Sequence, residues 1–235
     1  MSRTLSIETT IHGRVLVEDA AVSPSGRLLV AFHGYGQSAD EMLADVRAIP
    51  GVSAWQIVSI QALHRFYTRN DQGVVASWMT RQDRDLAIAD NVRYVDRVIE
   101  LVRGQGSGPR AQDGPIVFLG FSQGVAMAYR AAVLGRHRAA GVIALAGDIP
   151  PELSSADPGA TSSPRAAWPR VLIGVGTEER WYVADELNAD VTFLKAQDVE
   201  HEIVRFGGGH EWTDEFRNAA GRWLERLTAP VARGA

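Results

Sequence analysis

Short apolar segments recur along the chain, separated by longer stretches in which apolar and polar residues alternate with a helical period. A short continuous apolar run is typical of a strand that lies buried on both faces of a parallel sheet. On this basis we predict strands at residues 28–32, 56–60, 116–119 and 171–175. For residues 140–146 and 200–206 we also favour strands over helices. Before the first of these strands, we expect residues 5–11 and 14–18 to form an antiparallel hairpin that turns at His12 and Gly13.

Helical patterns occupy the stretches between these strands. Ser38 can cap a helix that runs to Ile49 and ends at Pro50 and Gly51. Further helices are predicted at residues 83–103, 122–134, 181–197 and 214–227. Strands that alternate with helices in this way indicate the α/β class, with a mostly parallel central sheet and helices on both faces.

Length and composition fit one such domain spanning residues 1–235. Two segments are expected to be surface loops, the glycine-rich stretch 104–109 and the Pro- and Ser-rich stretch 150–169. The chain has no cysteine, which excludes disulfides, thiolate metal sites and a cysteine nucleophile.

Charge and hydropathy narrow the possible partners. The formal net charge of −4 combines interspersed charges of both signs, so no basic field is available for nucleic acid. No apolar run is long enough for stable membrane insertion, and no secretory signal is visible, so a cytoplasmic location is expected. We expect a monomer or a homodimer that acts on a small-molecule substrate.

The most informative motif joins the predicted strand 116–119 to the predicted helix 122–134. It has the form G-x-S-x-G, with Gly120, Ser122 and Gly124. A strand that turns this sharply into a helix holds the serine in strained backbone geometry, and side chains at the two glycines would clash. The turn exposes the hydroxyl of Ser122, which we therefore predict to be a catalytic nucleophile, with the N–H of Gln123 directed toward a developing oxyanion.

A serine nucleophile needs a base, and the base needs a carboxylate to orient it. Three histidines follow Ser122. A surface role is favoured for His137 and a structural role for His201, whereas His210 follows a strand and three glycines and is the predicted base. A metal site that contains His201 and His210 would lack a third ligand at useful spacing, and we expect neither a metal nor another cofactor.

The carboxylate should follow the strand at residues 171–175. Glu178 and Glu179 occur there, and Asp148, after the preceding strand, is the alternative. A second oxyanion donor should come from the glycine-rich segment after residues 28–32, where we choose the N–H of Tyr35.

Taken together, these motifs resemble those of the carboxylesterase and acyl-protein thioesterase family of α/β-hydrolases, also known as the phospholipase/carboxylesterase family. The resemblance covers nearly the whole chain and rests on segments 33–36, 120–124, 176–179 and 209–210. It implies an α/β-hydrolase fold without a large cap domain, and cleavage of esters or thioesters of small to medium acyl chains. It also implies that Glu179 occupies the position of the triad acid, although the family pattern has aspartate there.

In this family the loop after the strand at residues 56–60 borders the substrate groove. The resemblance therefore suggests an apolar acyl site, for which we consider five aromatic residues, each of which could equally pack in the core: Phe66, Tyr67, Trp78, Trp181 and Tyr182.

Two other readings remain open. A dehalogenase or a dienelactone hydrolase of the same fold would place aspartate or cysteine where Ser122 stands, so the serine disfavours both. A non-catalytic binding protein on a hydrolase scaffold is the remaining alternative, because a fold does not fix a function.

Overall fold

The computed structural model describes residues 2–21, 26–70, 72–105, 114–154 and 168–229. Its centre is a seven-stranded sheet with the order β1-β3-β2-β6-β7-β8-β9. The strands of this sheet are β1 (Arg14–Glu18), β2 (Leu28–Phe32), β3 (Gln56–Gln61), β6 (Ile116–Phe121), β7 (Ala139–Leu145), β8 (Arg170–Gly176) and β9 (His201–Phe206). Only β1 pairs antiparallel, with β3, and the other five pairings are parallel. The predicted mostly parallel sheet is confirmed.

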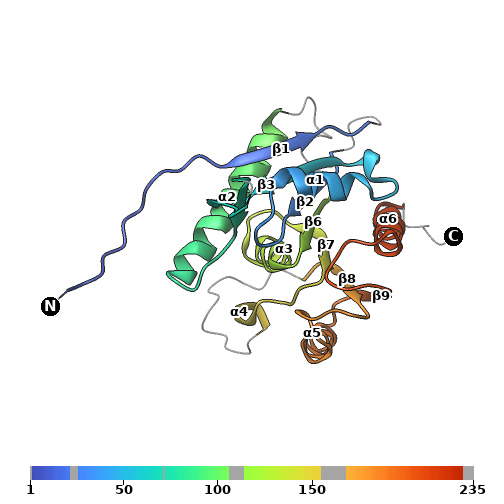
Figure 1. Ribbon diagram of the computed structural model, residues 1–235. Coiled ribbons are helices and arrows are strands. Elements are labelled where there is room, and N and C mark those ends of the chain that lie inside the picture. The colour runs from blue at the N-terminus through green and yellow to red at the C-terminus, as the bar shows by residue number, and fades with distance from the viewer. Residues whose placement is uncertain (1, 22–25, 71, 106–113, 155–167, 230–235) are drawn as a thin grey trace.

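Helices cover both faces of the sheet, as Figure 1 shows. On one face lie α1 (Ala39–Arg47) and α6 (Asp214–Thr228), and on the other lie α2 (Arg84–Gln105), α3 (Gln123–Leu134) and α5 (Ala184–Ala196). The short helices are η1 (Val52–Ala54) and α4 (Pro151–Ser154). Among the described residues, no helix combines the length and the apolar character that a membrane span requires.

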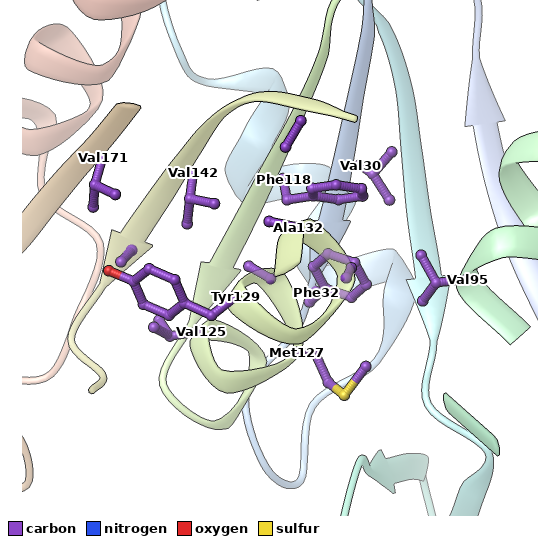
Figure 2. Close-up of a cluster of buried hydrophobic side chains, with 14 of the residues drawn as sticks. Val30, Phe32, Val95, Phe118, Val125, Met127, Tyr129, Ala132, Val142 and Val171 are labelled. Atoms are coloured by element: carbon purple, nitrogen blue, oxygen red, sulfur yellow. The ribbon is translucent and has the colours of Figure 1, made fainter. Parts of the chain in front are cut away.

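The two faces of the sheet bury separate apolar clusters. One lies between the sheet and α1 and α6, and the other between the sheet and α2, α3 and α5. Figure 2 shows the second cluster, in which Phe32 and Phe118 from the strands meet Val125 and Met127 from α3. Because α3 packs against β2, β6 and β7, the turn that starts it has a fixed position.

The parallel strands end at a common edge of the sheet. The carboxyl ends of β2, β6, β7, β8 and β9 are in register there, so the segments that follow them meet at this edge. Ligand sites of open α/β sheets lie at this edge because the loops that follow the strands converge there. All the predicted catalytic residues follow one of these strands.

The predicted hairpin of residues 5–11 and 14–18 is wrong. Residues 14–18 form β1, but they pair with β3, and residues 5–11 are extended without a strand partner. A Cβ added to Gly13 would lie 2.2 Å from the ring of Tyr94, so at this glycine the chain passes closely over α2. The Tyr94 hydroxyl donates a hydrogen bond to the carbonyl of Arg14, which fixes this path.

Three further predictions need correction. The segment after β3 contains a hairpin, β4 (His64–Tyr67) and β5 (Val74–Ser77), which was expected to be a loop. Helix α5 begins at Ala184 rather than at residue 181, because the segment before it packs around Glu179. Residues 151–154 of the predicted loop 150–169 form α4, and residues 155–167 lie outside the described part of the chain, as do residues 106–109 of the other predicted loop.

Candidate active site

Ser122 occupies the turn between β6 and α3. Its backbone has φ of 53° and ψ of −123°, a conformation that side-chain-bearing residues rarely adopt. A Cβ on Gly120 would lie 2.4 Å from the carbonyl oxygen of Gly124, and one on Gly124 would lie 2.0 Å from that of Phe32. Main-chain atoms cause both clashes, so glycine is required on each side of the serine.

Hydrogen bonds hold this turn from two directions. The N–H of Ser122 donates to the carbonyl of Leu145 at the end of β7, at 2.9 Å. The side-chain oxygen of Gln123 accepts the N–H of Trp78 at 2.9 Å, and its amide nitrogen donates to the carbonyl of Met79 at 3.3 Å. The elbow is therefore tied both to the sheet and to the segment that follows β5.

The turn leaves backbone donors available for an anion. Gln123 is the first residue of α3, so its N–H has no carbonyl partner within the helix. The partial positive charge of the helix N-terminus acts at the same place.

The segment after β2 approaches the serine closely. A Cβ on Gly34 would lie 3.4 Å from the Cβ of Ser122, which puts the following residue, Tyr35, beside the elbow. The neighbouring amides are engaged: the N–H of Gly34 donates to the Gln37 side chain, and that of Gly36 donates to Ala76. Within the described part of the chain, the N–H of Tyr35 has no acceptor.

His33 fixes this segment from within the core. Its Nε2 accepts the N–H of Ala62 at 3.1 Å, so Nδ1 carries the proton and donates to the carbonyl of Gly34 at 2.7 Å. Burial lowers the pKa of His33, and the ring is therefore neutral. The indole N–H of Trp78 donates to the carbonyl of His33 at 2.8 Å.

Glu179 and His210 form a pair at the ends of β8 and β9. Nδ1 of His210 lies 3.0 Å from each carboxylate oxygen of Glu179. The side chain of Glu179 is 2% exposed, and that of His210 is 24% exposed. A carboxylate can only accept, so Nδ1 carries the proton and Nε2 is left with a lone pair.

Backbone donors complete the environment of the carboxylate. The amides of Arg180 and Trp181 each donate to Oε1 of Glu179 at 2.8 Å. Burial raises the pKa of Glu179, but the hydrogen bonds from Trp181 and His210 more than offset this, and the pKa lies below its ordinary value. Glu179 is therefore ionised at neutral pH.

Glycines bring the histidine to this position. A Cβ on Gly176 would lie 2.4 Å from the carbonyl oxygens of both Gly208 and Gly209, so the loop before His210 lies directly on the end of β8. The ring of His210 packs against that of Phe121, with centroids 5.0 Å apart, next to Ser122 in the chain. Between these two described residues, Ser122 and His210, no hydrogen bond is formed; such contacts are commonly long before substrate binds.

The other residues considered for the acid and the base do not take part in this pair. Glu178 and Asp148 are exposed, and neither bonds to a histidine among the described residues. His201 begins β9 and its Nδ1 contacts the carbonyl of Val199, and His137 lies in the segment before β7.

The five aromatic residues considered for the acyl site fall into two groups. Phe66, Tyr67 and Trp181 are exposed, and the ring of Phe66 packs on that of Tyr35 with centroids 5.6 Å apart. Trp78 and Tyr182, at 0% and 2% exposure, lie in the core, so a groove position is wrong for both. Their polar groups are bonded inside the protein, Trp78 to His33 and Tyr182 to Asp190.

Three features were not predicted from the sequence. They are the hydrogen bonds of His33, those of the Gln123 side chain, and the buried Asp190. A histidine directly between a buried strand and a glycine was a usable signal for the first. For Asp190, the signal was an acidic residue at helical spacing between Leu187 and Leu194, on the apolar face of α5. Within the described residues, no cluster of three or more His, Asp or Glu side chains could hold a metal ion.

Comparison with solved structures finds the same fold in several esterases. Esterase PE8 has a TM-score of 0.71 and 18% identity, and covers 92% of this chain and 100% of its own. Acyl-protein thioesterase 2 of Zea mays has a TM-score of 0.68 and 17% identity, and covers 93% of this chain and 100% of its own. The carboxylesterase of Bacillus cereus has a TM-score of 0.66 and 15% identity, with coverage of 92% and 94%. A comparison with curated proteins gave no match.

At these identities the likeness to solved structures shows the α/β-hydrolase fold alone. The family comes from the sequence: the phospholipase/carboxylesterase family model matches residues 16–166. This match includes Tyr35, Ser122 and Gln123, whereas Glu179 and His210 lie beyond it. Since the match spans more than half of the chain, the protein belongs to the phospholipase/carboxylesterase family and is a hydrolase.

Proposed function

We propose that the protein is a serine hydrolase that cleaves carboxylic esters or thioesters through an acyl-enzyme on Ser122. His210 acts as general base and acid, and Glu179 holds its Nδ1–H and so presents Nε2 to the serine. The N–H groups of Tyr35 and Gln123 receive the oxyanion. The observation that carries this proposal is the Glu179–His210 pair, which lies beside the strained Ser122 elbow at one edge of the sheet.

In the first half-reaction Ser122 Oγ attacks the acyl carbonyl carbon while its proton passes to Nε2 of His210. The carbonyl oxygen becomes an oxyanion that accepts hydrogen bonds from the two backbone amides. The intermediate collapses when the bond to the alcohol or thiol breaks and His210 gives its proton to that leaving group. Ser122 then carries the acyl group as an ester.

Water completes the cycle. Nε2 of His210 takes a proton from a water molecule as its oxygen attacks the acyl-enzyme, and the same amides stabilise the second oxyanion. Collapse returns the proton to Ser122 Oγ and releases the carboxylic acid. Glu179 remains ionised throughout, since its role is to orient the histidine and stabilise its positive charge. Apart from this water molecule, the steps use side chains and backbone amides of the protein.

The substrate range follows from family membership and from the aromatic side chains near the site. Phe66, Tyr67 and Trp181 are exposed and offer flat apolar surfaces to an acyl chain. Phe66 contacts Tyr35, whose N–H is a proposed oxyanion donor, so a chain bound on this surface would lie next to the reacting carbonyl. We therefore propose small to medium acyl chains as substrates.

A fluorophosphonate probe tests the proposal, because it labels only an activated serine. The wild type should be labelled and Ser122→Ala should not, and the variant should lose turnover of p-nitrophenyl esters by several orders of magnitude. A series of these esters with increasing acyl length then measures the substrate range. An unlabelled wild type would instead support a binding protein on a hydrolase scaffold.

A further inference from the structure

We propose that Asp190 is a positioning residue for the catalytic acid: it anchors Tyr182, and through Tyr182 the segment that surrounds the Glu179 carboxylate. This inference rests on the proposed function, in which Glu179 orients His210. Asp190 lies on α5, is 6% exposed, and touches neither Ser122 nor His210. Its effect on the reaction would therefore be indirect.

One carboxylate oxygen of Asp190 holds two separate parts of the chain. Oδ2 accepts the hydroxyl proton of Tyr182 at 2.9 Å and the backbone N–H of Ile149 at 3.1 Å. Tyr182 belongs to the segment after β8, and Ile149 to the segment after β7. The Ile149 bond fixes the carboxylate relative to the sheet, so the tyrosine is fixed as well.

Tyr182 is the anchor of the segment that bears the acid. Between the end of β8 at Gly176 and the start of α5 at Ala184, it is the one residue that belongs to the hydrophobic core. The backbone amides of residues 180–182 all point to Oε1 of Glu179, at 2.8, 2.8 and 3.5 Å. Movement of Tyr182 would therefore move the donors that hold the Glu179 carboxylate.

The surroundings of Asp190 make its burial costly, which argues against a role in stability alone. Burial raises its pKa to about 7 and also raises the pKa of Tyr182. The nearby Tyr129 hydroxyl is buried and has no hydrogen-bond partner among the described residues, and Figure 2 shows its side chain extending from α3 along the sheet. A buried carboxyl without a cationic partner loses free energy of folding when it ionises. Its direct effect is on the placement of Tyr182.

The test compares Asp190→Leu with Asp190→Asn. Leucine removes the acceptor and should lower kcat for p-nitrophenyl esters roughly 10- to 100-fold with little change in KM, because the acid is displaced by a fraction of an ångström. Asparagine keeps an acceptor oxygen and should retain most of the turnover. Asp96→Leu is the matched control. Asp96 is also buried and accepts the backbone N–H of Arg136, but it lies on α2 rather than on α5. It should leave kcat unchanged.

A double-mutant cycle separates positioning from a general structural effect. In a Glu179→Gln background the acid is already lost, so Asp190→Leu should cause no further fall in kcat. An equal fall in both backgrounds would overturn the proposal. The Nδ1–H proton resonance of His210 gives a readout without substrate: Asp190→Leu should shift or broaden it, and an unchanged resonance would also overturn the proposal. Wild-type protein without Ser122-dependent turnover would instead overturn the proposed function, whatever the resonance shows.

Discussion

Nδ1 of His210 lies 3.0 Å from both carboxylate oxygens of Glu179, and the backbone amides of Arg180 and Trp181 donate to Oε1 of the same carboxylate. The family resemblance implies aspartate at this position, and the longer side chain of glutamate fits because the segment of residues 180–182 folds around it. The amide N–H groups keep the carboxylate ionised and fix its direction.

Glu179→Gln should therefore reduce ester turnover by about four orders of magnitude, because the neutral amide no longer selects the histidine tautomer that leaves Nε2 free. Glu178→Gln and Asp148→Asn change exposed carboxylates without a histidine partner and should leave turnover near that of the wild type. The measurement is steady-state kcat with a p-nitrophenyl ester, with folding checked by circular dichroism. A loss of turnover in Asp148→Asn would instead indicate that the triad acid is Asp148, in the segment after β7.

The elbow makes a second prediction, about Gly124. Gly124→Ala puts a Cβ 2.0 Å from the carbonyl oxygen of Phe32, which belongs to a central strand and has no room to move. We expect loss of fluorophosphonate labelling at Ser122, together with a clear drop in the free energy of unfolding.

Gly104→Ala is the matched control for this substitution. Gly104 lies in α2, and an added Cβ there meets no atom within 4 Å. Alanine should stabilise the helix by about 0.5–1 kcal/mol and leave labelling intact. Normal labelling in Gly124→Ala would show that the elbow tolerates a side chain and that its glycine is not required.

A third prediction concerns His33. His33→Leu leaves the N–H of Ala62 and the carbonyl of Gly34 without their buried partner and should cost roughly 1–3 kcal/mol of stability. Because the same residue fixes the segment that carries the Tyr35 N–H, kcat should fall more than KM rises. His201→Leu, at a half-exposed position on the edge strand β9, should change neither quantity much. Chemical denaturation measures the loss of stability, and steady-state kinetics measures the fall in kcat. Equal effects of His33→Leu and His201→Leu on both quantities would contradict the role assigned to His33.

The sequence predicted those parts of the fold whose signal is local. Continuous apolar runs identified the strands that became β2, β3, β6 and β8, and the strands β7 and β9 were also predicted. The G-x-S-x-G motif identified the turn at Ser122. The wrong hairpin at residues 5–11 and 14–18 shows the limit, because a local pattern can predict a strand but not its partner. Arg14 pairs with Gln61, 47 positions away, and no local pattern encodes that choice.

The site was predictable to the same extent. Strand ends placed His210 and the two candidate glutamates, but the choice between Glu178 and Glu179 depended on the family resemblance. Composition does not reveal which of the aromatic residues are buried and which are exposed. The indole N–H of Trp78 donates to His33 inside the core, whereas Trp181 is exposed, one residue before the buried Tyr182. Burial of this kind depends on contacts between distant segments.

The last prediction is a pH dependence of stability that arises from Asp190. Its pKa in the folded protein is about 7, compared with an ordinary value of 3.8, because the carboxyl is buried. The groups that face it are the hydroxyls of Tyr182 and Tyr129, the carboxylates of Asp148 and Glu186, and the amide of Ile149. No positively charged group is among them, so only the hydrogen bonds from Tyr182 and Ile149 oppose the cost of ionisation, and burial outweighs them.

Between pH 3.8 and about 7 the folded state therefore keeps a proton at Asp190 that the unfolded state has released. Under this condition the free energy of unfolding contributed by the residue decreases as pH rises, and it stays at the lower value above pH 7. Asp190→Asn cannot ionise, so its stability relative to the wild type should increase as the pH rises from 3.8 to about 7 and stay constant above that. Urea denaturation of both proteins at several pH values measures the difference. A difference that stays constant with pH would mean that the folded-state pKa of Asp190 is not raised.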